Sequence, residues 1–160
     1  MKEYDTIIIG GGAAGLTAAL YTGRKKLKTL IVSIDLGGQT LLTDNIENYP
    51  GVDSSPGPEL MAKFQSQATK FGAEVIMGEA NAIKKIGKTF EVNLSNGEKY
   101  SGKTIIVASG KTARKIGAPG EDKFMGRGVS TCATCDAAFF KDKEVVVVGG
   151  GNSAFEAAEL

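Results

Sequence analysis

Ile7-Ile8-Ile9-Gly10-Gly11-Gly12-Ala13-Ala14-Gly15 is the stretch that decides the fold. Its three consecutive isoleucines end an apolar segment over 4–9, which is typical of a strand buried on both faces of a parallel sheet. The segment over 13–24 carries apolar residues three and four positions apart, and this spacing predicts a helix. The order strand, glycine turn, helix therefore favours an α/β fold with a parallel sheet.

The glycine turn has the spacing Gly-x-Gly-x-x-Gly. Gly10 permits a tight turn, Gly12 lets the backbone approach a pyrophosphate, and Gly15 lets the helix pack closely on the strand. A second apolar strand is expected over 28–33, followed by Asp35, an acid placed where ribose hydroxyls are bound in such units. Together these features predict a dinucleotide-binding unit, and the alternative interpretation is a glycine turn that binds no ligand.

The rest of the chain predicts further short elements. An irregular segment over 36–58 either wraps a ligand or is a solvated surface loop. Ala108-Ser109-Gly110 ends a strand with small residues, which would let a bulky ligand lie against the backbone. The other predicted elements are a helix over 59–71, strands over 74–77, 82–86, 89–94, 98–100, 103–107 and 145–148, and a short helical run ending at Phe140.

A second glycine turn, Gly149-Gly150-Gly151-Asn152-Ser153-Ala154, follows the predicted buried strand over 145–148 and opens another helix. A domain boundary is expected between about 111 and 126. A parallel βαβ unit needs a second strand to complete its sheet, and this one has a single strand and part of a helix. We therefore expect these 160 residues to be a fragment of a longer protein.

Composition and charge limit the functions that the chain can have. The 19 basic and 18 acidic residues give a net charge of +1 without a basic patch, so a nucleic-acid partner has no electrostatic support. No apolar run approaches the ~20 residues of a membrane span, and no signal-peptide pattern is present, so we expect a cytoplasmic protein. Histidine is absent, which excludes catalysis by Ser-His or Cys-His pairs and metal sites built on histidine.

The only two cysteines lie in Cys132-Ala133-Thr134-Cys135-Asp136. Four interpretations compete: half of a zinc site, a structural disulfide, two unrelated buried thiols, and a redox dithiol. A zinc site lacks further Cys or His ligands, and a disulfide closing so short a loop restrains little chain, so we favour the redox dithiol. Asp136 is then the proton donor or acceptor beside the thiols, although it is also suited to capping a helix.

In their order along the chain, the Gly10–Gly15 turn, Gly37-Gly38-Gln39, Glu47-Asn48-Tyr49-Pro50-Gly51, Cys132–Asp136 and the Gly149–Ala154 turn resemble the low-molecular-weight thioredoxin reductases. The resemblance covers essentially the whole chain. It implies an α/β fold with an incomplete FAD-binding Rossmann-like three-layer ββα domain, made of a parallel sheet, a helix layer and a small antiparallel β-meander. The first β-α of a second nucleotide-binding domain would follow, with domain bounds of 1–113 and 114–160.

The resemblance also implies cofactor sites, whereas no metal site is expected because the chain has no His and no further Cys. Gln39 would lie near the flavin of FAD, Asp35 near its ribose and Glu79-Ala80 near its adenine. The implied FAD-binding residues are Gly10, Gly12, Ala13, Ala14, Gly15, Ser33, Ile34, Asp35, Gly37, Gly38, Gln39, Thr40, Thr43, Asn48, Glu79, Ala80, Ala108, Ser109 and Gly110. The implied NADPH-binding residues are Gly149, Gly151, Asn152, Ser153 and Ala154.

In the family that the chain resembles, hydride passes from NADPH to FAD, and FAD reduces a disulfide. The resemblance implies that Cys135 faces the flavin, that Cys132 attacks the partner's disulfide, and that Asp136 is the general acid. The implied partner is thioredoxin or a similar small disulfide protein, and the implied assembly is a homodimer. Alkyl hydroperoxide reductase flavoproteins have a similar core behind an N-terminal extension, and the start of this chain at the first strand argues against them.

The family continues well beyond residue 160, through the rest of the NADPH domain and a last segment that contacts FAD. We therefore expect this chain alone not to oxidise NADPH. Two alternatives stay open: an FAD-binding portion without turnover of its own, and a related flavin disulfide reductase that uses another donor, such as reduced ferredoxin.

Overall fold

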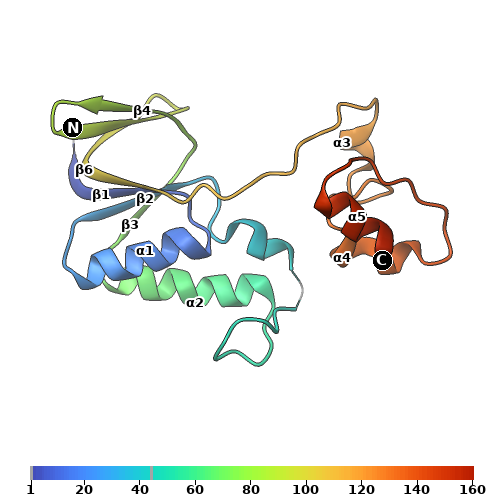
Figure 1. Cartoon of the computed structure of the whole chain (residues 1–160). Helices are drawn as coiled ribbons and strands as arrows, with labels where there is room; N and C mark the ends of the chain where they lie inside the picture. The colour runs from blue at the N-terminus through green and yellow to red at the C-terminus, as the bar shows by residue number, and fades with distance from the viewer. Residues whose placement is uncertain (1, 44) are drawn as a thin grey trace. The chain divides into compact units, whose positions relative to one another are not determined.

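The computed structural model describes residues 2–43 and 45–160, with the side chains of Thr134 and Cys135 outside that description. The chain divides into two compact units, Met1–Lys111 and Thr112–Leu160. Figure 1 labels most of the helices and strands of the two units.

The first unit is built on a six-stranded sheet with the strand order β3-β2-β1-β6-β5-β4. Strands β3, β2, β1 and β6 are parallel, whereas β5 and β4 pair antiparallel at one side. The strands are β1 Glu3–Ile9, β2 Thr29–Ser33, β3 Glu74–Met77, β4 Ala80–Ile86, β5 Thr89–Leu94 and β6 Lys99–Val107. The predicted α/β class, with a parallel sheet and an antiparallel meander, is confirmed.

Helices α1 (Ala13–Arg24) and α2 (Gly57–Lys70) lie side by side on one face of the sheet (Figure 1). The 3-10 helix η1 (Gly38–Leu42) follows β2 inside the predicted irregular segment. The apolar stripes of the two helices cover the side chains that the parallel strands send to this face. The buried members of this cluster are Ile8, Leu16, Ala19, Ile31, Ala68 and Ala73.

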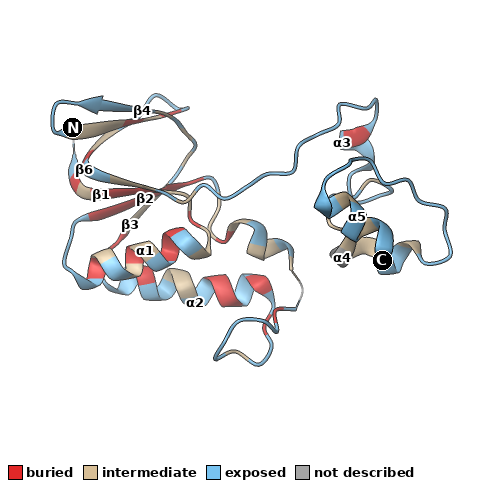
Figure 2. Ribbon diagram, viewed as in Figure 1, coloured by how far each residue is buried: buried red, intermediate tan, exposed pale blue. Residues whose placement is uncertain are grey.

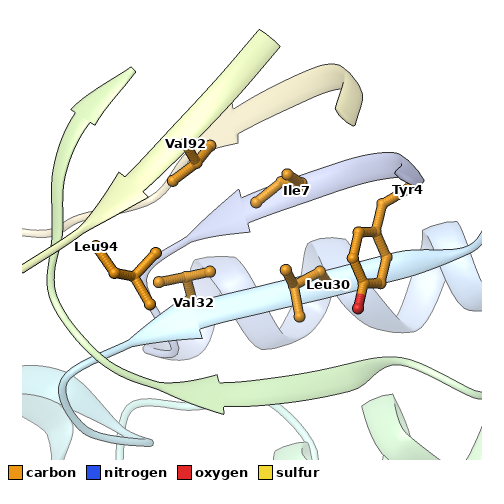
Figure 3. Close-up of a cluster of buried hydrophobic side chains, with 6 residues drawn as sticks. All are labelled: Tyr4, Ile7, Leu30, Val32, Val92 and Leu94. Atoms are coloured by element: carbon orange, nitrogen blue, oxygen red, sulfur yellow. The ribbon is translucent and has the colours of Figure 1, made fainter. Parts of the chain in front are cut away.

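The opposite face of the parallel strands is buried under β5 (Figure 3). Because strand side chains alternate between faces, Ile7 points to this second cluster while Ile8 points to the helices. The buried members of the second cluster are Tyr4, Ile7, Leu30, Val32, Val92 and Leu94. Burial on both faces explains why the strands read as continuous apolar runs in the sequence.

Strand β6 corrects one sequence-based expectation. The segments 98–100 and 103–107 were predicted to be separate strands, but they belong to a single strand that pairs with both β5 and β1. Gly102 in its middle is not a break. A Cβ built on Gly102 would lie 2.8 Å from Cγ1 of Ile7, so the glycine is needed for the close approach of β6 to the core.

The second unit contains four short helices: α3 Glu121–Phe124, α4 Ala133–Asp136, η2 Ala137–Phe140 and α5 Asn152–Glu159. Helix α3 was not predicted, because a single turn is too short to show a periodic pattern. Its Glu121 is buried, and the carboxylate accepts hydrogen bonds from the backbone N–H groups of Ile116 (3.1 Å) and Gly117 (2.8 Å).

The prediction of a buried strand over 145–148 is wrong for this structure. The segment forms no strand, and the four valines are between 40% and 88% exposed. A strand is stabilised by a neighbour that completes its hydrogen bonds and by a layer that covers its side chains. The described residues of the second unit supply neither, and most of this unit is drawn as exposed in Figure 2.

Candidate functional site

The candidate site lies at one edge of the sheet, where the parallel strands have their carboxyl ends. The turn Gly10–Gly15 follows β1, the segment Ser33–Thr40 begins at the end of β2, and Ala108–Gly110 follows β6. Hydrogen bonds connect these strand ends, since the backbone N–H of Gly10 donates to Val32 O (2.8 Å) and that of Ala108 to Ile9 O (2.7 Å). This edge is where α/β sheets bind their ligands.

The glycine turn is shaped by close packing at three of its positions, Gly10, Gly11 and Gly15, and a Cβ on Gly11 would lie 2.8 Å from Asp35 O. Gly10 has a φ of +106°, and a Cβ there would lie 2.2 Å from Ala108 O. A Cβ on Gly15 would lie 1.8 Å from Gly10 O. Gly12 differs, because the nearest atom to its Cβ would be Gly37 O at 3.8 Å, so that position faces open space. The turn therefore has an unfilled space in front of its middle glycine.

The N-terminus of α1 adjoins this open space. Gly12 is its N-cap residue, and no side chain caps the helix among the residues that the structure describes. Its first turn holds no acid, and Ala13 and Ala14 add little bulk there. The amides of a first turn lack partners within the helix and carry a partial positive charge, so they suit a phosphate group.

The segment after β2 is ordered by two short hydrogen bonds, one to the glycine turn and one within the segment itself. The backbone N–H of Gly11 donates to the buried Ser33 Oγ at 2.7 Å. The backbone N–H of Gly38 donates to Asp35 Oδ1, also at 2.7 Å. Asp35 is therefore fixed at the predicted edge, while the ribose contact assigned to it stays a prediction. Ile34, the residue between Ser33 and Asp35, is 71% exposed.

A cavity of about 560 Å³ opens beside this segment. Its lining includes five of the predicted flavin-site residues: Ala13, Gln39, Thr40, Thr43 and Asn48. The rest of its lining was not among the predicted site residues: Asn45, Ile46, Glu47, Tyr49, Leu60, Met61 and Phe64. The signal for Glu47 and Tyr49 was their place in the Glu47–Gly51 motif.

The apolar stripe of α2 contributes to both the core and the cavity. Leu60 is 4% exposed, yet Leu60 and Phe64 also line the cavity. Tyr49 packs edge-on against Phe64, with ring centroids 5.6 Å apart. One wall of the cavity is therefore apolar and aromatic.

The polar part of the cavity is made of amide and hydroxyl side chains, with Glu47 as the one charged residue in the described lining. Residues 29–62 contain neither Lys nor Arg. A large ring system with a polar rim matches such a cavity, and a phosphate would be bound by the α1 amides instead of by cations. The residues present therefore fit a flavin dinucleotide.

Glu79 and Ala80 lie beyond the end of β3, outside the described cavity lining. The backbone N–H of Gly78 donates to Ser33 O (2.8 Å), which joins β3 to the same sheet edge. Glu79 is exposed and accepts a hydrogen bond from Ser95 Oγ (3.1 Å), while Ala80 begins β4 and is half-buried. Ser109 and Gly110 are likewise exposed at this edge.

The dithiol segment lies in the second unit. Cys132 precedes α4, and its backbone N–H donates to Ser130 Oγ at 3.0 Å. The backbone N–H of Asp136 donates to Cys132 O at 3.1 Å. The side chain of Cys135 is outside the described residues, so its pairing with Cys132 stays a prediction. Asp136 stands before η2 but makes no side-chain capping bond to it among the described residues, which does not support the capping interpretation.

The second glycine turn precedes α5. Gly149 has a φ of +142°, and Gly151 is the N-cap residue of a helix whose first turn holds no acid. A Cβ on Gly150 or Gly151 would meet no heavy atom within 4 Å. Asn152, Ser153 and Ala154 form the first turn of the helix. The space beside Gly150 and Gly151 is therefore open. The role of this turn in NADPH binding stays a prediction.

Two negative findings concern the described residues only. They contain no helix that is both long and apolar enough to span a membrane. Nor do they contain a group of three or more Cys, Asp or Glu side chains arranged to hold a metal ion.

Comparison with known proteins gives consistent results. The family described as pyridine nucleotide-disulphide oxidoreductase matches residues 4–160. Thioredoxin reductases of Bacillus subtilis and Listeria innocua are each 51% identical to the chain over 158 residues, which is 97% of this chain and 49% of each relative. The chain therefore spans about half the length of these relatives.

Solved structures match over the same extent. The crystal structure of Lactococcus lactis thioredoxin reductase has a TM-score of 0.78 at 43% identity, over 98% of this chain and 52% of that one. A ferredoxin-flavin thioredoxin reductase from Clostridium acetobutylicum has a TM-score of 0.66 at 36% identity, over 99% of this chain and 55% of that one. The fold, the sheet-edge geometry and the match over residues 4–160 agree: the chain belongs to the pyridine nucleotide-disulphide oxidoreductase family.

Proposed function

We propose that this chain is part of a flavin-dependent disulfide reductase that passes electrons from NADPH through FAD to a Cys132–Cys135 disulfide and on to thioredoxin. The observation that carries the proposal is the sheet edge, where the open glycine turn lies next to a partly aromatic cavity whose described lining contains no Lys or Arg. The dithiol sequence and the thioredoxin reductases at 51% identity support the disulfide chemistry.

In this proposal the first unit binds FAD. The amides at the start of α1 bind the pyrophosphate, with Gly12 leaving room for it. Asp35, fixed by its hydrogen bond from Gly38, accepts hydrogen bonds from ribose hydroxyls. Asn48 and Phe64 would line the space for the ring system, and Phe64 would exclude water from one side of it. When bound, FAD accepts a hydride from NADPH and supplies two electrons to the disulfide.

The dithiol step needs two electrons and two protons to convert the disulfide into two thiols. Cys135 takes the electrons from the flavin side, and the Cys132 thiolate then attacks the partner's disulfide to give a mixed disulfide. Cys135 resolves this intermediate by forming the Cys132–Cys135 bond again. Asp136 is the nearest acid in sequence, and it supplies the proton to the leaving thiolate of the partner.

The remaining assignments belong to the same proposal. Residues 1–113 form the FAD domain, and 114–160 begin the NADPH domain, with the Gly149–Gly151 turn at the pyrophosphate of NADPH. The enzyme is a cytoplasmic homodimer whose partner is thioredoxin or a similar small disulfide protein. The nearly balanced charge argues against a nucleic-acid partner.

A second donor is favoured by one observation. The Clostridium acetobutylicum structure, whose title names ferredoxin, resembles this chain over 99% of its length. Reduced ferredoxin is therefore the alternative to NADPH. An FAD-binding portion without turnover is the other alternative for this length of chain, and we expect the 160 residues alone not to oxidise NADPH.

The test uses the protein in its natural length. We expect a yellow protein whose flavin absorption bleaches on anaerobic addition of NADPH, and whose Cys132→Ser variant keeps both properties but no longer reduces thioredoxin. Bleaching by reduced ferredoxin and not by NADPH would select the second donor. A colourless protein after reconstitution with FAD would overturn the proposal.

A further inference from the structure

One wall of the cavity is a loop without regular secondary structure. Residues 45–49 line the cavity, and the chain then turns away and returns to Ser55, just before α2. In Figure 1 this loop extends past the first turn of α2. Its shape therefore depends on a few contacts instead of on a helix or a ladder of strands.

Backbone hydrogen bonds close the base of the loop. Ile46 and Ser55 form an antiparallel bridge, in which the N–H of Ile46 donates to Ser55 O (2.8 Å) and the N–H of Ser55 to Ile46 O (3.2 Å). Ile46 and Ser55 are 9% and 4% exposed. This bridge fixes where the loop begins and ends, but not the position of the residues between.

A chain of side-chain hydrogen bonds, which we name the Asn45 chain, crosses the loop outside the bridge. Ser54 Oγ donates to Asn45 Oδ1, and Asn45 Nδ2 donates to Glu47 Oε1 at 2.8 Å. Asn45 and Glu47 line the cavity, whereas Ser54 is absent from its described lining. The Asn45 chain thus connects the cavity wall to Ser54, on the part of the loop that returns toward α2.

The Asn45 chain contributes little to the stability of the fold, because all three side chains are exposed to water. What it does fix is the direction of the segment that leads to Asn48 and Tyr49. Tyr49 reaches Phe64 across the cavity wall, with ring centroids 5.6 Å apart. A loop held at both its base and its wall keeps Asn48 and Tyr49 on this side of the cavity.

We propose that Asn45 is a positioning residue, which through Ser54 and Glu47 holds the cavity wall in place and so slows release of the cofactor. This inference rests on the proposed function, since it takes FAD to be the group in the cavity. Loss of the Asn45 chain lets the loop open more often, which raises the dissociation rate while leaving the association rate nearly unchanged.

The experiment measures FAD release from the protein in its natural length. Flavin fluorescence is followed after the loaded protein is mixed with an excess of an FAD-capturing apoprotein. We expect Asn45→Ala and Ser54→Ala each to release FAD roughly threefold to tenfold faster than the wild type. Glu47→Gln keeps an acceptor oxygen for Asn45, and we expect release close to the wild-type rate.

The chain offers a matched control at the turn between β5 and β6. There Asn96 Nδ2 donates to Glu98 Oε2 at 3.0 Å, which is the same exposed Asn–Glu pair two residues apart, outside the cavity lining. We expect Asn96→Ala to leave FAD release unchanged.

Each outcome separates the hypotheses. Faster release in Asn45→Ala alone would show a direct contact with FAD and would overturn the positioning role, because Ser54 acts only through Asn45. Wild-type rates in both variants would overturn the inference while leaving FAD binding intact. A wild-type protein that binds no FAD would instead remove the proposed function itself.

Discussion

Gly10 and Gly12 stand two residues apart in one turn and have opposite surroundings. Gly10 combines a left-handed φ with a backbone carbonyl 2.2 Å from the position of a Cβ. Gly12 has an extended backbone with φ −76° and ψ −171°, and open space in front of it. Gly10 is therefore required by the fold, whereas Gly12 leaves space open in front of the turn.

This difference gives the first prediction. Gly10→Ala should lower the free energy of unfolding by about 2–4 kcal/mol, through backbone strain and the clash with Ala108 O. The free energy of unfolding of Gly12→Ala should lie within about 0.5 kcal/mol of the wild-type value, but this variant should bind FAD more weakly. Denaturant unfolding and FAD titration measure the two effects. Equal loss of stability in both variants would contradict this account.

Glu121 gives a second prediction at this scale. Its carboxylate is the acceptor for two backbone N–H groups, and the residue is 8% exposed. In Glu121→Ala, the amides of Ile116 and Gly117 should exchange with solvent roughly tenfold to a hundredfold faster. Hydrogen exchange followed by NMR measures this, with the neighbouring exposed Asp122→Ala as the control. Unchanged exchange at both amides would show that the carboxylate does not order this segment.

At the scale of elements, the sequence predicted α1 and β3 with the bounds that the structure has. Both have a strong periodic or apolar pattern that ends at a glycine or at a loop. The sequence predicted two strands within β6, on either side of Ser101 and Gly102, and only the contact with Ile7 shows why position 102 is a glycine. Such packing between distant residues leaves no local pattern in a single sequence.

Strand β6 supplies the third prediction. Gly102→Ala should lower the free energy of unfolding by about 1–3 kcal/mol, because its new methyl group overlaps Ile7 in the core. Ser101→Ala, one position earlier on β6, is the control and should change stability by less than about 1 kcal/mol. Thermal unfolding compares the two, and similar midpoints would mean that β6 moves to accept the methyl group.

Ion pairs at the amino ends of the strands make the stability of the first unit depend on pH. A hydrogen bond from Lys103 Nζ (2.7 Å), followed by one from the backbone N–H of Lys28, lowers the pKa of Asp5. Lys2, followed by the hydroxyl of Tyr4, lowers the pKa of Glu74 in the same way. The unfolded chain therefore binds protons on these carboxylates at a higher pH than the folded chain does.

In the fourth prediction, the direction in which stability changes with pH follows from this difference in proton binding between the folded and unfolded chain. The stabilisation is complete above the unfolded carboxylate pKa of about 4, and it is lost as the pH falls through the lowered folded values. Asp5→Asn should therefore have a shallower loss of stability between about pH 5 and pH 3 than the wild type. Urea unfolding across this range measures the slopes, and parallel curves would contradict the role of Asp5.

At the scale of the whole molecule, the two compact units meet in the sequence at Lys111 and Thr112. Residues 109–118 are exposed and have no regular secondary structure. The fifth prediction is that trypsin cuts first after Lys111, Arg114 or Lys115, before any site inside the first unit. Mass spectrometry of the early fragments tests this, and a first cut within the first unit would contradict it.

The candidate site was predictable where a motif records it. The glycine turn, Asp35 and Asn48 were predicted from the motifs and the resemblance, and the structure places them at the sheet edge or in the cavity lining, while their roles stay predictions. Tyr49, Leu60 and Phe64 were missed as lining residues, because apolar side chains on a helix have the same pattern whether they face a core or a cavity. Three-dimensional packing alone separates those two cases.

The four exposed valines over 145–148 have a consequence for handling the protein. Consecutive β-branched residues without charge or proline are the composition that initiates intermolecular β-aggregation when their backbone has no partner. Lys143 and Glu144 on one side and the three glycines on the other act as gatekeepers that weaken such stacking. The isolated 160 residues should therefore aggregate above a threshold protein concentration. A charge introduced within the valines should raise the concentration at which turbidity begins.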